Sequence, residues 1–446
     1  MQGIDREITR LAVPAFLALV AEPLFLLADA AVVGHLGTAE LAGLGIAGAV
    51  LQTAVGLCVF LAYGTTGSVA RQVGAKDLTG ALARGVDGLW LAVLLGAVLT
   101  PTGVLLAGPL VDLFGTAPAV AEQATTYLRI GVLGIIPLLL MLAATGVLRG
   151  LQDTRTPLVV AVVGSGLNIV FNLLLVYGAG PVPGLGIAGS ALGSVLAQVL
   201  SAAALVTVVV RGARREGASL GPHVTGIRTA GRAGLALVVR TLTLRAVLLV
   251  TTLAVSHGTS GDAATLAAHQ LALTLWVLMA FVLDAIAIAG QAITGRYLGA
   301  GDAAGTRLVT RRLVRWGIVG GIVTGALLAA MSPVLGPLFT GDHDVTRLLV
   351  PVLLIAALGQ PVAGVVFVLD GVLIGAGDGR YLAWAGLAVL AVFAPLTLLL
   401  VGLGGGLVAI WVAFVVMFMG GRFVTLIWRA RSDAWLVTGP SPKVRT

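Results

Sequence analysis

Two acidic residues lie inside the first long apolar run of the chain, where an ionised group is costly. Glu22 and Asp29 are seven residues apart, so a helix would place both carboxyl groups on one face. A charge near the middle of a membrane costs about 2.5–3.5 kcal/mol on insertion scales, and a low dielectric favours the neutral acid. Such acids are suited to carrying a proton across a membrane. Alternatively, one of them caps backbone groups freed near Pro23.

A second proline precedes these acids on the same predicted helix. Pro14 lies fifteen residues before Asp29. Proline removes an intrahelical hydrogen bond and makes a bend easier. We therefore expect a hinge at Pro14. The alternative is that Pro14 only marks the start of the regular helix.

Amides and a hydroxyl group occur in later apolar runs of the first half. Asn168 and Asn172 are one helical turn apart and share a face, and Ser190 follows in the next run. These side chains are candidates for a polar network around a substrate cavity. Interhelical hydrogen bonds with a purely structural role are the alternative.

The second half carries its own set of polar candidates. His269, Asp284 and Gln291 share one apolar run, and Asp370 lies at the end of another. We expect roles in coupling or in substrate binding for these four residues. Structural alternatives are an ion pair of Asp370 with Arg380 or with an arginine of the central link. In the same way, Arg240 and Arg245 would pair with these acids or extend to the membrane surface.

The elements that position these residues are long apolar runs. Of the 446 residues, 58% are hydrophobic and 10% are charged, against about 25% charged in a soluble domain. A transmembrane helix needs about 20 apolar residues. This composition excludes a soluble enzyme and a disordered chain, and the single cysteine, Cys58, excludes a disulfide scaffold. The sequence predicts an all-α polytopic membrane protein whose twelve spans cover 8–33, 40–66, 84–107, 123–147, 157–178, 185–210, 234–256, 263–292, 310–331, 345–370, 381–401 and 405–428.

The basic residues predict an orientation. All 27 Lys and Arg except Arg129 and Arg347 fall at the termini, in the links after even-numbered spans or at the ends of spans that adjoin them, as Arg240 and Arg245 do just inside the span 234–256. This bias predicts that both termini and these links are cytoplasmic. It also explains the net charge of +8 without any nucleic acid.

Short motifs recur along the chain at an offset of 225 residues. The stretch that begins at Arg71 and contains Gly74, Ala75 and Asp77 returns at Arg296, and 146–155 returns as 371–380. Two homologous six-helix lobes related by a pseudo-twofold axis along the membrane normal are typical of parallel-repeat transporters. We expect Asp77 and its counterpart to cap the following helices. The predicted division is 1–210 for the first lobe, 211–232 for a cytoplasmic linker, 233–430 for the second lobe and 431–446 for a cytoplasmic tail.

At this point the motifs resemble a known family. The segments 21–24 and 29–37, together with 268–270, 281–285, 290–292 and 370–378, resemble the multidrug and toxic-compound extrusion (MATE) family, in particular its DinF-type branch. The resemblance implies the MATE fold and ion-driven efflux of organic, mostly cationic compounds. In similar proteins, bending of the first helix near a proline is proposed to accompany protonation of an acid like Asp29. Some members carry an acid where this sequence has Asn172, which weakens a sodium site there.

The leading hypothesis is therefore a proton-coupled antiporter that works by alternating access, with no cofactor or metal. Sodium coupling, or a flippase for lipid-linked or anionic metabolites, are the alternatives. Expected partners are small organic cations or other amphiphilic drugs and the lipid bilayer, and the protein is expected to be a monomer. No DDxxD motif and no GxxxxGK[ST] loop occurs, which disfavours a membrane prenyltransferase or an ATP-driven pump. Heavy use of Arg over Lys and abundant Ala and Gly suggest a bacterial inner membrane.

Overall fold

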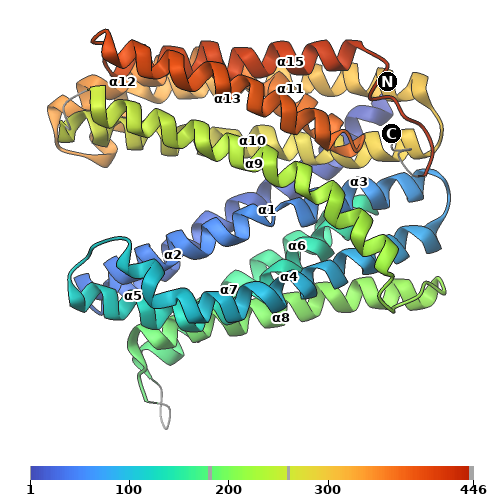
Figure 1. Ribbon diagram of the computed structural model, residues 1–446, viewed down its shortest axis with the longest axis horizontal. Coiled ribbons are helices and arrows are strands. Elements are labelled where there is room, and N and C mark those ends of the chain that lie inside the picture. The colour runs from blue at the N-terminus through green and yellow to red at the C-terminus, as the bar shows by residue number, and fades with distance from the viewer. Residues whose placement is uncertain (1, 179–182, 259–261, 441–446) are drawn as a thin grey trace. The chain divides into compact units, whose positions relative to one another are not determined.

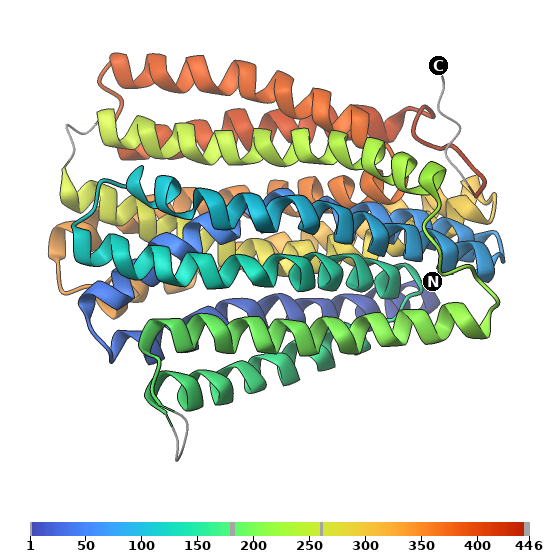
Figure 2. The same ribbon diagram turned by 60° about the horizontal axis from the view of Figure 1, so that its bottom comes forward.

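The computed structural model describes residues 2–178, 183–258 and 262–440. The regular structure in these ranges is helical (Figures 1 and 2). Within these ranges, twelve helices or joined helices are long and apolar enough to cross a membrane, which confirms the predicted number. Each is longer than its predicted run, because the helix continues beyond the run at one end or at both.

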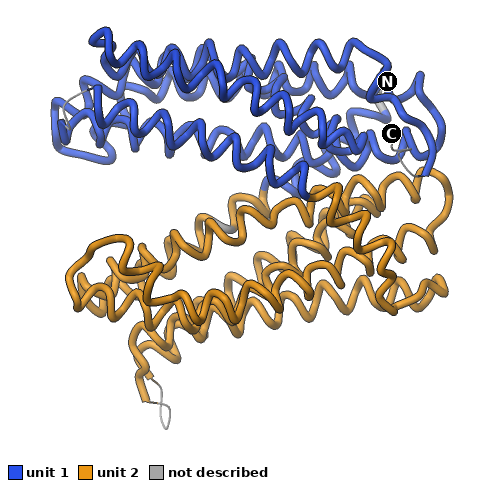
Figure 3. Tube along the Cα trace, viewed as in Figure 1, with its two compact units in different colours: residues 1–16, 235–446 blue, residues 17–234 orange. Residues whose placement is uncertain are grey.

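Contacts divide the chain into two compact units (Figure 3). Unit 2 comprises residues 17–234 and unit 1 comprises residues 1–16 and 235–446. The helices up to the middle of the chain are α1 (Gln2–Gly34), α2 (Thr38–Leu57), α3 (Phe60–Gly74), α4 (Leu78–Asp112), α5 (Pro118–Gly131), η1 (Val132–Gly134), α6 (Ile135–Gly150), α7 (Arg155–Tyr177) and α8 (Gly186–Arg215). Those that follow are α9 (Val224–Gly258), α10 (Ala263–Gly299), α11 (Ala303–Phe339), α12 (His343–Gly375), α13 (Gly379–Gly402), α14 (Leu407–Ala413), η2 (Phe414–Met419) and α15 (Gly420–Arg431).

The internal repeat is visible in the local geometry of the two units. Helices α4 and α11 begin 225 residues apart, and so do the ends of α6 and α12. Asp77 and Asp302 both accept a 2.7 Å hydrogen bond from the backbone N–H three residues on, at Gly80 and Gly305. The predicted capping role of Asp77 and its counterpart is therefore confirmed.

Matched glycines permit close packing at corresponding helix crossings. A Cβ atom on Gly146 would lie 2.5 Å from the carbonyl oxygen of Ala62, and a Cβ atom on Gly371 would lie 2.4 Å from that of Ala287. No side chain fits at these distances, so both crossings require glycine. The repeat thus preserves packing contacts as well as sequence.

The observed division differs from the predicted lobes at their starts. Residues 1–16 of α1 belong to unit 1, although the rest of the helix belongs to unit 2. In the same way, the first part of α9, up to Gly234, belongs to unit 2 and the remainder to unit 1. Helix α8 also continues to Arg215 and α9 begins at Val224, so much of the predicted linker 211–232 is helical. Of the predicted tail, 441–446 lie outside the described residues.

Candidate functional site

Asp29 is the centre of a buried polar cluster in unit 2. Its side chain comes from α1, and the residue is 2% exposed. Oδ1 accepts hydrogen bonds from Ser190 Oγ of α8 at 2.7 Å and from Asn172 Nδ2 of α7 at 2.5 Å. Oδ2 accepts one from Tyr127 Oη of α5 at 3.1 Å. Four helices therefore meet at one carboxyl group, and its three partners are uncharged.

A second layer of hydrogen bonds fixes the amides that surround Asp29. Asn172 Nδ2 also contacts Asn168 Oδ1 at 3.2 Å, and Asn168 Nδ2 donates to Ser194 Oγ at 2.9 Å. All three side chains are buried. Asn172 Oδ1 is buried without a hydrogen-bond partner. A protonated carboxyl group is a hydrogen-bond donor. The unsatisfied amide oxygen of Asn172 could accept a hydrogen bond from such a donor.

The structure thus brings together four residues that the sequence singled out, namely Asp29, Asn168, Asn172 and Ser190. Tyr127 and Ser194 were missed. The tyrosine hydroxyl was the available signal for Tyr127, because a phenol inside an apolar span normally has a polar partner. Ser194 lies one turn after Ser190 on the same helix face. Glu22 lies in α1, but its side chain is outside the described residues.

Pro14 lies in the interior of α1, twelve residues after the first residue of the helix at Gln2. The alternative that it merely starts the helix is therefore wrong. The division between the two units follows Phe16, two residues beyond this proline. The missing N–H of Pro14 weakens the helix close to the point where it passes from one unit to the other.

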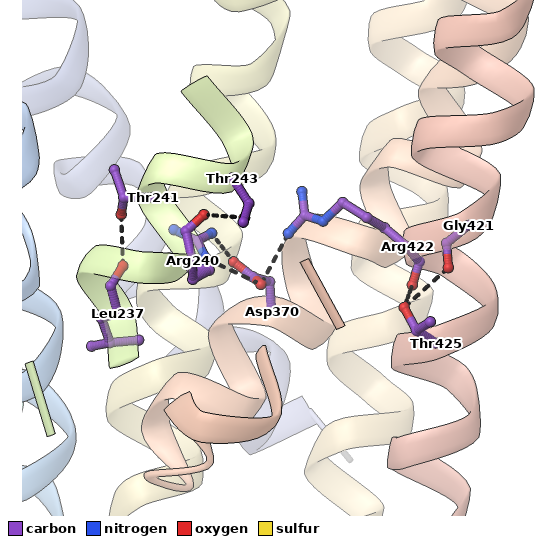
Figure 4. Close-up of polar contacts among 8 residues, drawn as sticks. All are labelled: Leu237, Arg240, Thr241, Thr243, Asp370, Gly421, Arg422 and Thr425. Carbon is purple, nitrogen blue, oxygen red and sulfur yellow. Dashed lines mark hydrogen bonds and ion pairs between the residues drawn. The ribbon is translucent and has the colours of Figure 1, made fainter. Parts of the chain in front are cut away.

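Asp370 of α12 lies in a different electrostatic environment, in unit 1. It forms ion pairs with Arg240 of α9 and with Arg422 of α15, the latter at 2.9 Å (Figure 4). All three side chains are at most 14% exposed. A cavity of about 10 Å³, enough for about one water molecule, lies beside them. Two guanidinium groups thus pair with one carboxylate, and the three side chains together carry one formal positive charge.

These contacts correct the assignment of Arg422 and decide between the alternatives left for Asp370 and for Arg240. Asp370 does not pair with Arg380, which is exposed. Arg422 is part of a spanning helix and is buried, so it is no topology signal of the tail. Arg240 pairs with an acid, as one alternative held, whereas Arg245 is exposed on α9.

His269 of α10 is buried in an aromatic contact within unit 1. Its Nδ1 accepts from Trp411 Nε1 at 3.2 Å, and its Nε2 lies 3.1 Å from Thr252 Oγ1. The Thr252 hydroxyl already donates to the carbonyl of Leu248, so Nε2 carries the proton of a neutral imidazole. A second proton on Nδ1 would remove the bond from Trp411. Both contacts therefore fit the neutral ring.

The remaining two candidates, Gln291 and Asp284, also lie on α10. Gln291 is buried, and a Cβ atom on Gly375 would lie 2.4 Å from its backbone oxygen, so α10 and α12 are in close contact there. Asp284 is half-buried on the same helix. The described residues contain no group of three or more His, Cys, Asp and Glu side chains that could hold a metal ion.

The turns between spans have separate electrostatic roles. Asp153 caps α7 through the N–H groups of Arg155 and Thr156, both at 3.0 Å. Its repeat counterpart Asp378 instead accepts from Arg429 Nε at 2.6 Å. Burial raises the pKa of Asp378, and Arg429 offsets part of that effect. Unit 1 thus has an ion pair where unit 2 has a helix cap.

Comparisons with known proteins agree with this architecture. A sequence model of the MatE family matches residues 14–174 and 236–399. Protein DETOXIFICATION 44, chloroplastic, of Arabidopsis thaliana is 30% identical over 99% of this chain and 85% of its own length. DNA damage-inducible protein F of Escherichia coli (strain K12) is 32% identical over 97% of this chain and 94% of its own.

Solved structures share the fold as well. A crystal structure of MATE in the bent conformation has a TM-score of 0.88 and 22% identity, with 97% of this chain and 96% of that chain covered. The family match covers most of both repeats, and the relatives match along almost the whole chain. The chain therefore belongs to the MatE family of multidrug and toxic-compound efflux transporters, and it is a transporter rather than an enzyme.

Proposed function

We propose that this transporter exports organic compounds in exchange for protons, and that Asp29 is the proton-carrying group. The observation that supports this most strongly is the contrast between the two buried acids. Asp29 is surrounded by uncharged donors, so gain of a proton neutralises the cluster. Asp370 is bound by two arginines, so gain of a proton there would leave two cations without a counter-charge.

The position of Asp29 along α1 suits uptake from outside. It lies five residues before the end of the helix at Gly34, or about 8 Å at 1.5 Å per residue. The arginine bias places that end on the extracellular side. A proton therefore has a short path from the outer surface to Asp29, and a longer path back through the rest of α1.

Protonation changes the hydrogen bonds that hold α1 in place. An ionised Asp29 accepts from Ser190, Asn172 and Tyr127, whereas a neutral Asp29 has one fewer acceptor site and one new donor. Rotation of the Asn172 amide would present its unsatisfied oxygen to that donor. The cluster can therefore accommodate both states but holds α1 differently in each. Because Pro14 lacks a backbone N–H, a bend of α1 there breaks fewer hydrogen bonds and costs less free energy.

The driving force follows from the charge moved. Exchange of one proton for one monovalent organic cation moves no net charge, so only the pH difference contributes. This amounts to about 1.4 kcal/mol per pH unit.

We propose small organic cations as the main substrates, a bacterial inner membrane as the location, cytoplasmic termini and a monomeric protein. Sodium coupling is the second candidate, favoured by the free oxygen of Asn172.

The test uses proteoliposomes that contain the full-length protein, with ethidium as the probe. A pH gradient, inside acidic or alkaline, and a sodium gradient are imposed separately. We expect the pH gradient to drive ethidium movement, and Asp29→Asn to abolish it. The control is Asp112→Asn, the same chemical change at an exposed position of α4, which should behave as wild type. Transport driven by sodium alone, or normal transport by Asp29→Asn, would refute the proposal.

A further inference from the structure

A large groove in unit 1 combines basic side chains with an apolar wall, and the transport mechanism proposed above does not use it. Its volume is about 550 Å³. Arg307, Arg311 and Arg315 of α11 line one side, and Arg431 at the end of α15 lines another. We propose that this groove binds the phosphate headgroup of an anionic lipid from the cytoplasmic leaflet.

The spacing of the arginines forms a continuous basic stripe. Arg307, Arg311 and Arg315 follow one another at four-residue intervals, so they project from one face of α11. The Cα atoms of successive arginines are about 6 Å apart along the helix axis. Two neighbouring guanidinium groups can therefore contact one phosphate group. Arg311 and Arg315 are exposed. Arginine binds phosphate oxygens with two parallel hydrogen bonds, which makes such a stripe a favourable phosphate site.

The other wall of the groove is built by the segment after α15. Asp433 forms an ion pair with Arg307, and Trp435 Nε1 donates to the carbonyl of Ala430 at 3.2 Å. The N–H of Gly439 donates to the carbonyl oxygen of Leu298 at 2.9 Å, which ties this segment to α10. The Trp435 ring is 2% exposed and lines the groove. The groove is therefore a formed part of the fold and not a gap between surface side chains.

The charge of the groove requires an anionic occupant. Four arginines line it, and the one carboxylate described at its edge, Asp433, leaves a surplus of three positive charges. A topology signal needs only basic residues near helix ends. It does not need arginines from two helices that converge on the same cavity. Basic pockets between helices on the cytoplasmic side are typical of sites for anionic headgroups.

The level of the groove in the membrane selects a lipid over a soluble phosphate. From Trp316 to Phe339, α11 has 24 residues, which is about 36 Å at 1.5 Å per residue. This exceeds the hydrocarbon thickness of about 30 Å. The arginine stripe therefore falls at the headgroup level, on the side that the arginine bias predicts to be cytoplasmic. Leu369 and Ile427 supply an apolar wall against which the upper part of an acyl chain can pack.

The test measures lipid retention by the full-length protein. Protein from vesicles of phosphatidylcholine and phosphatidylglycerol is analysed by native mass spectrometry, and the affinity for phosphatidylglycerol is obtained by titration. We expect the double variant Arg311→Gln/Arg315→Gln to bind phosphatidylglycerol about 30-fold more weakly, which is about 2 kcal/mol at 1.4 kcal/mol per tenfold. Arg311→Lys/Arg315→Lys keeps the charge and should remain within a few-fold of wild type.

The control pair removes two charges elsewhere on the side predicted to be cytoplasmic. Arg214→Gln/Arg215→Gln changes two exposed arginines at the end of α8, and it should retain phosphatidylglycerol as wild type does. Equal loss in this pair would show that only the overall surface charge matters, and would overturn the site. Equal retention by wild type and by the Arg311 and Arg315 glutamine variant would overturn it as well.

Two further measurements separate the sources of the phosphate group and guard against misfolding. Brominated phosphatidylglycerol should quench tryptophan fluorescence more than brominated phosphatidylcholine, and Trp435→Phe should remove that difference. This readout needs no arginine variant to fold, and its failure would overturn the proposal. Inorganic phosphate should not compete with the lipid; full displacement by phosphate would assign the groove to a soluble anion instead.

Discussion

Removal of the carboxylate of Asp370 tests the electrostatic reasoning most directly. The cluster in unit 1 contains one negative and two positive side chains, all nearly buried. Asp370→Asn leaves two guanidinium groups beside each other with a combined charge of +2. Loss of one partner from a buried ion pair costs about 3–5 kcal/mol, and we expect a loss of stability in this range.

The opposite change should cost less. Arg422→Met keeps an unbranched apolar stem but removes the guanidinium group, and it leaves Asp370 paired with Arg240, so the cluster becomes neutral. It loses one hydrogen bond to a charged group, about 1.5–3 kcal/mol, but it also buries one charge fewer. We expect a net loss of about 2 kcal/mol or less. The double variant carries one positive charge, as the wild type does, and should fall between the two.

The tryptophans of the chain allow the stability of unit 1 to be measured without an added label. Six of the seven tryptophans lie in unit 1, and the single, buried Cys58 lies in unit 2. Thermal unfolding in detergent is followed by tryptophan fluorescence, with thiol labelling as the second signal. Asp344→Asn, an exposed site on the same helix α12, is the control. A stable Asp370→Asn variant, or greater damage from Arg422→Met, would contradict the reasoning.

Three other changes address the first helix and the loops. Tyr127→Phe removes one of three donors to ionised Asp29, so transport should persist with its pH dependence shifted to higher pH; an unchanged profile in the ethidium assay would exclude a role for this hydroxyl. Pro14→Ala restores a backbone donor within α1, so thermal stability should rise while the transport rate falls, and a rate at or above that of wild type would argue against a hinge. Hydrogen bonds from Thr265 lower the pKa of Asp262. Their stabilising effect is present above the unfolded pKa and is lost as pH falls through the folded pKa, so the loss of stability of Asp262→Ala in thermal unfolding should be full at pH 7 and should shrink as the pH is lowered through the acidic range.

The arrangement of the spans was largely predictable because it depends on local pattern. Apolar runs of sufficient length must form helices in a membrane, and the offset of 225 placed Asp77 and Asp302 at equivalent turns before their capping bonds were known. Asp29, Asn172 and Ser190 were found for a related reason. A polar side chain in an apolar run needs a partner, and few other polar groups were available.

What could not be predicted depends on contacts between distant parts of the sequence. Tyr127 is 98 residues from Asp29, and no spacing rule connects them. Arg422 was misassigned because a basic residue near the end of an apolar run has the same pattern whether it faces water or a buried acid. Only the packing of α9, α12 and α15 distinguishes these cases. The assignment of residues 1–16 to unit 1 left no sequence signal at all.

The shared membership of α1 has a consequence for biosynthesis. Residues 1–16 are made well before the partners with which they group, which begin at residue 235. At about 5–20 residues per second, synthesis of the chain from residue 16 to residue 235 takes roughly 10–40 s. Residues 1–16 have no part of unit 1 to pack against during this time. During that interval Asp5 has no Arg312 and Glu7 has no Arg296 to pair with. Asp5 and Glu7 thus form these ion pairs only after the second half of the chain has been made, so the pairs mark its completion.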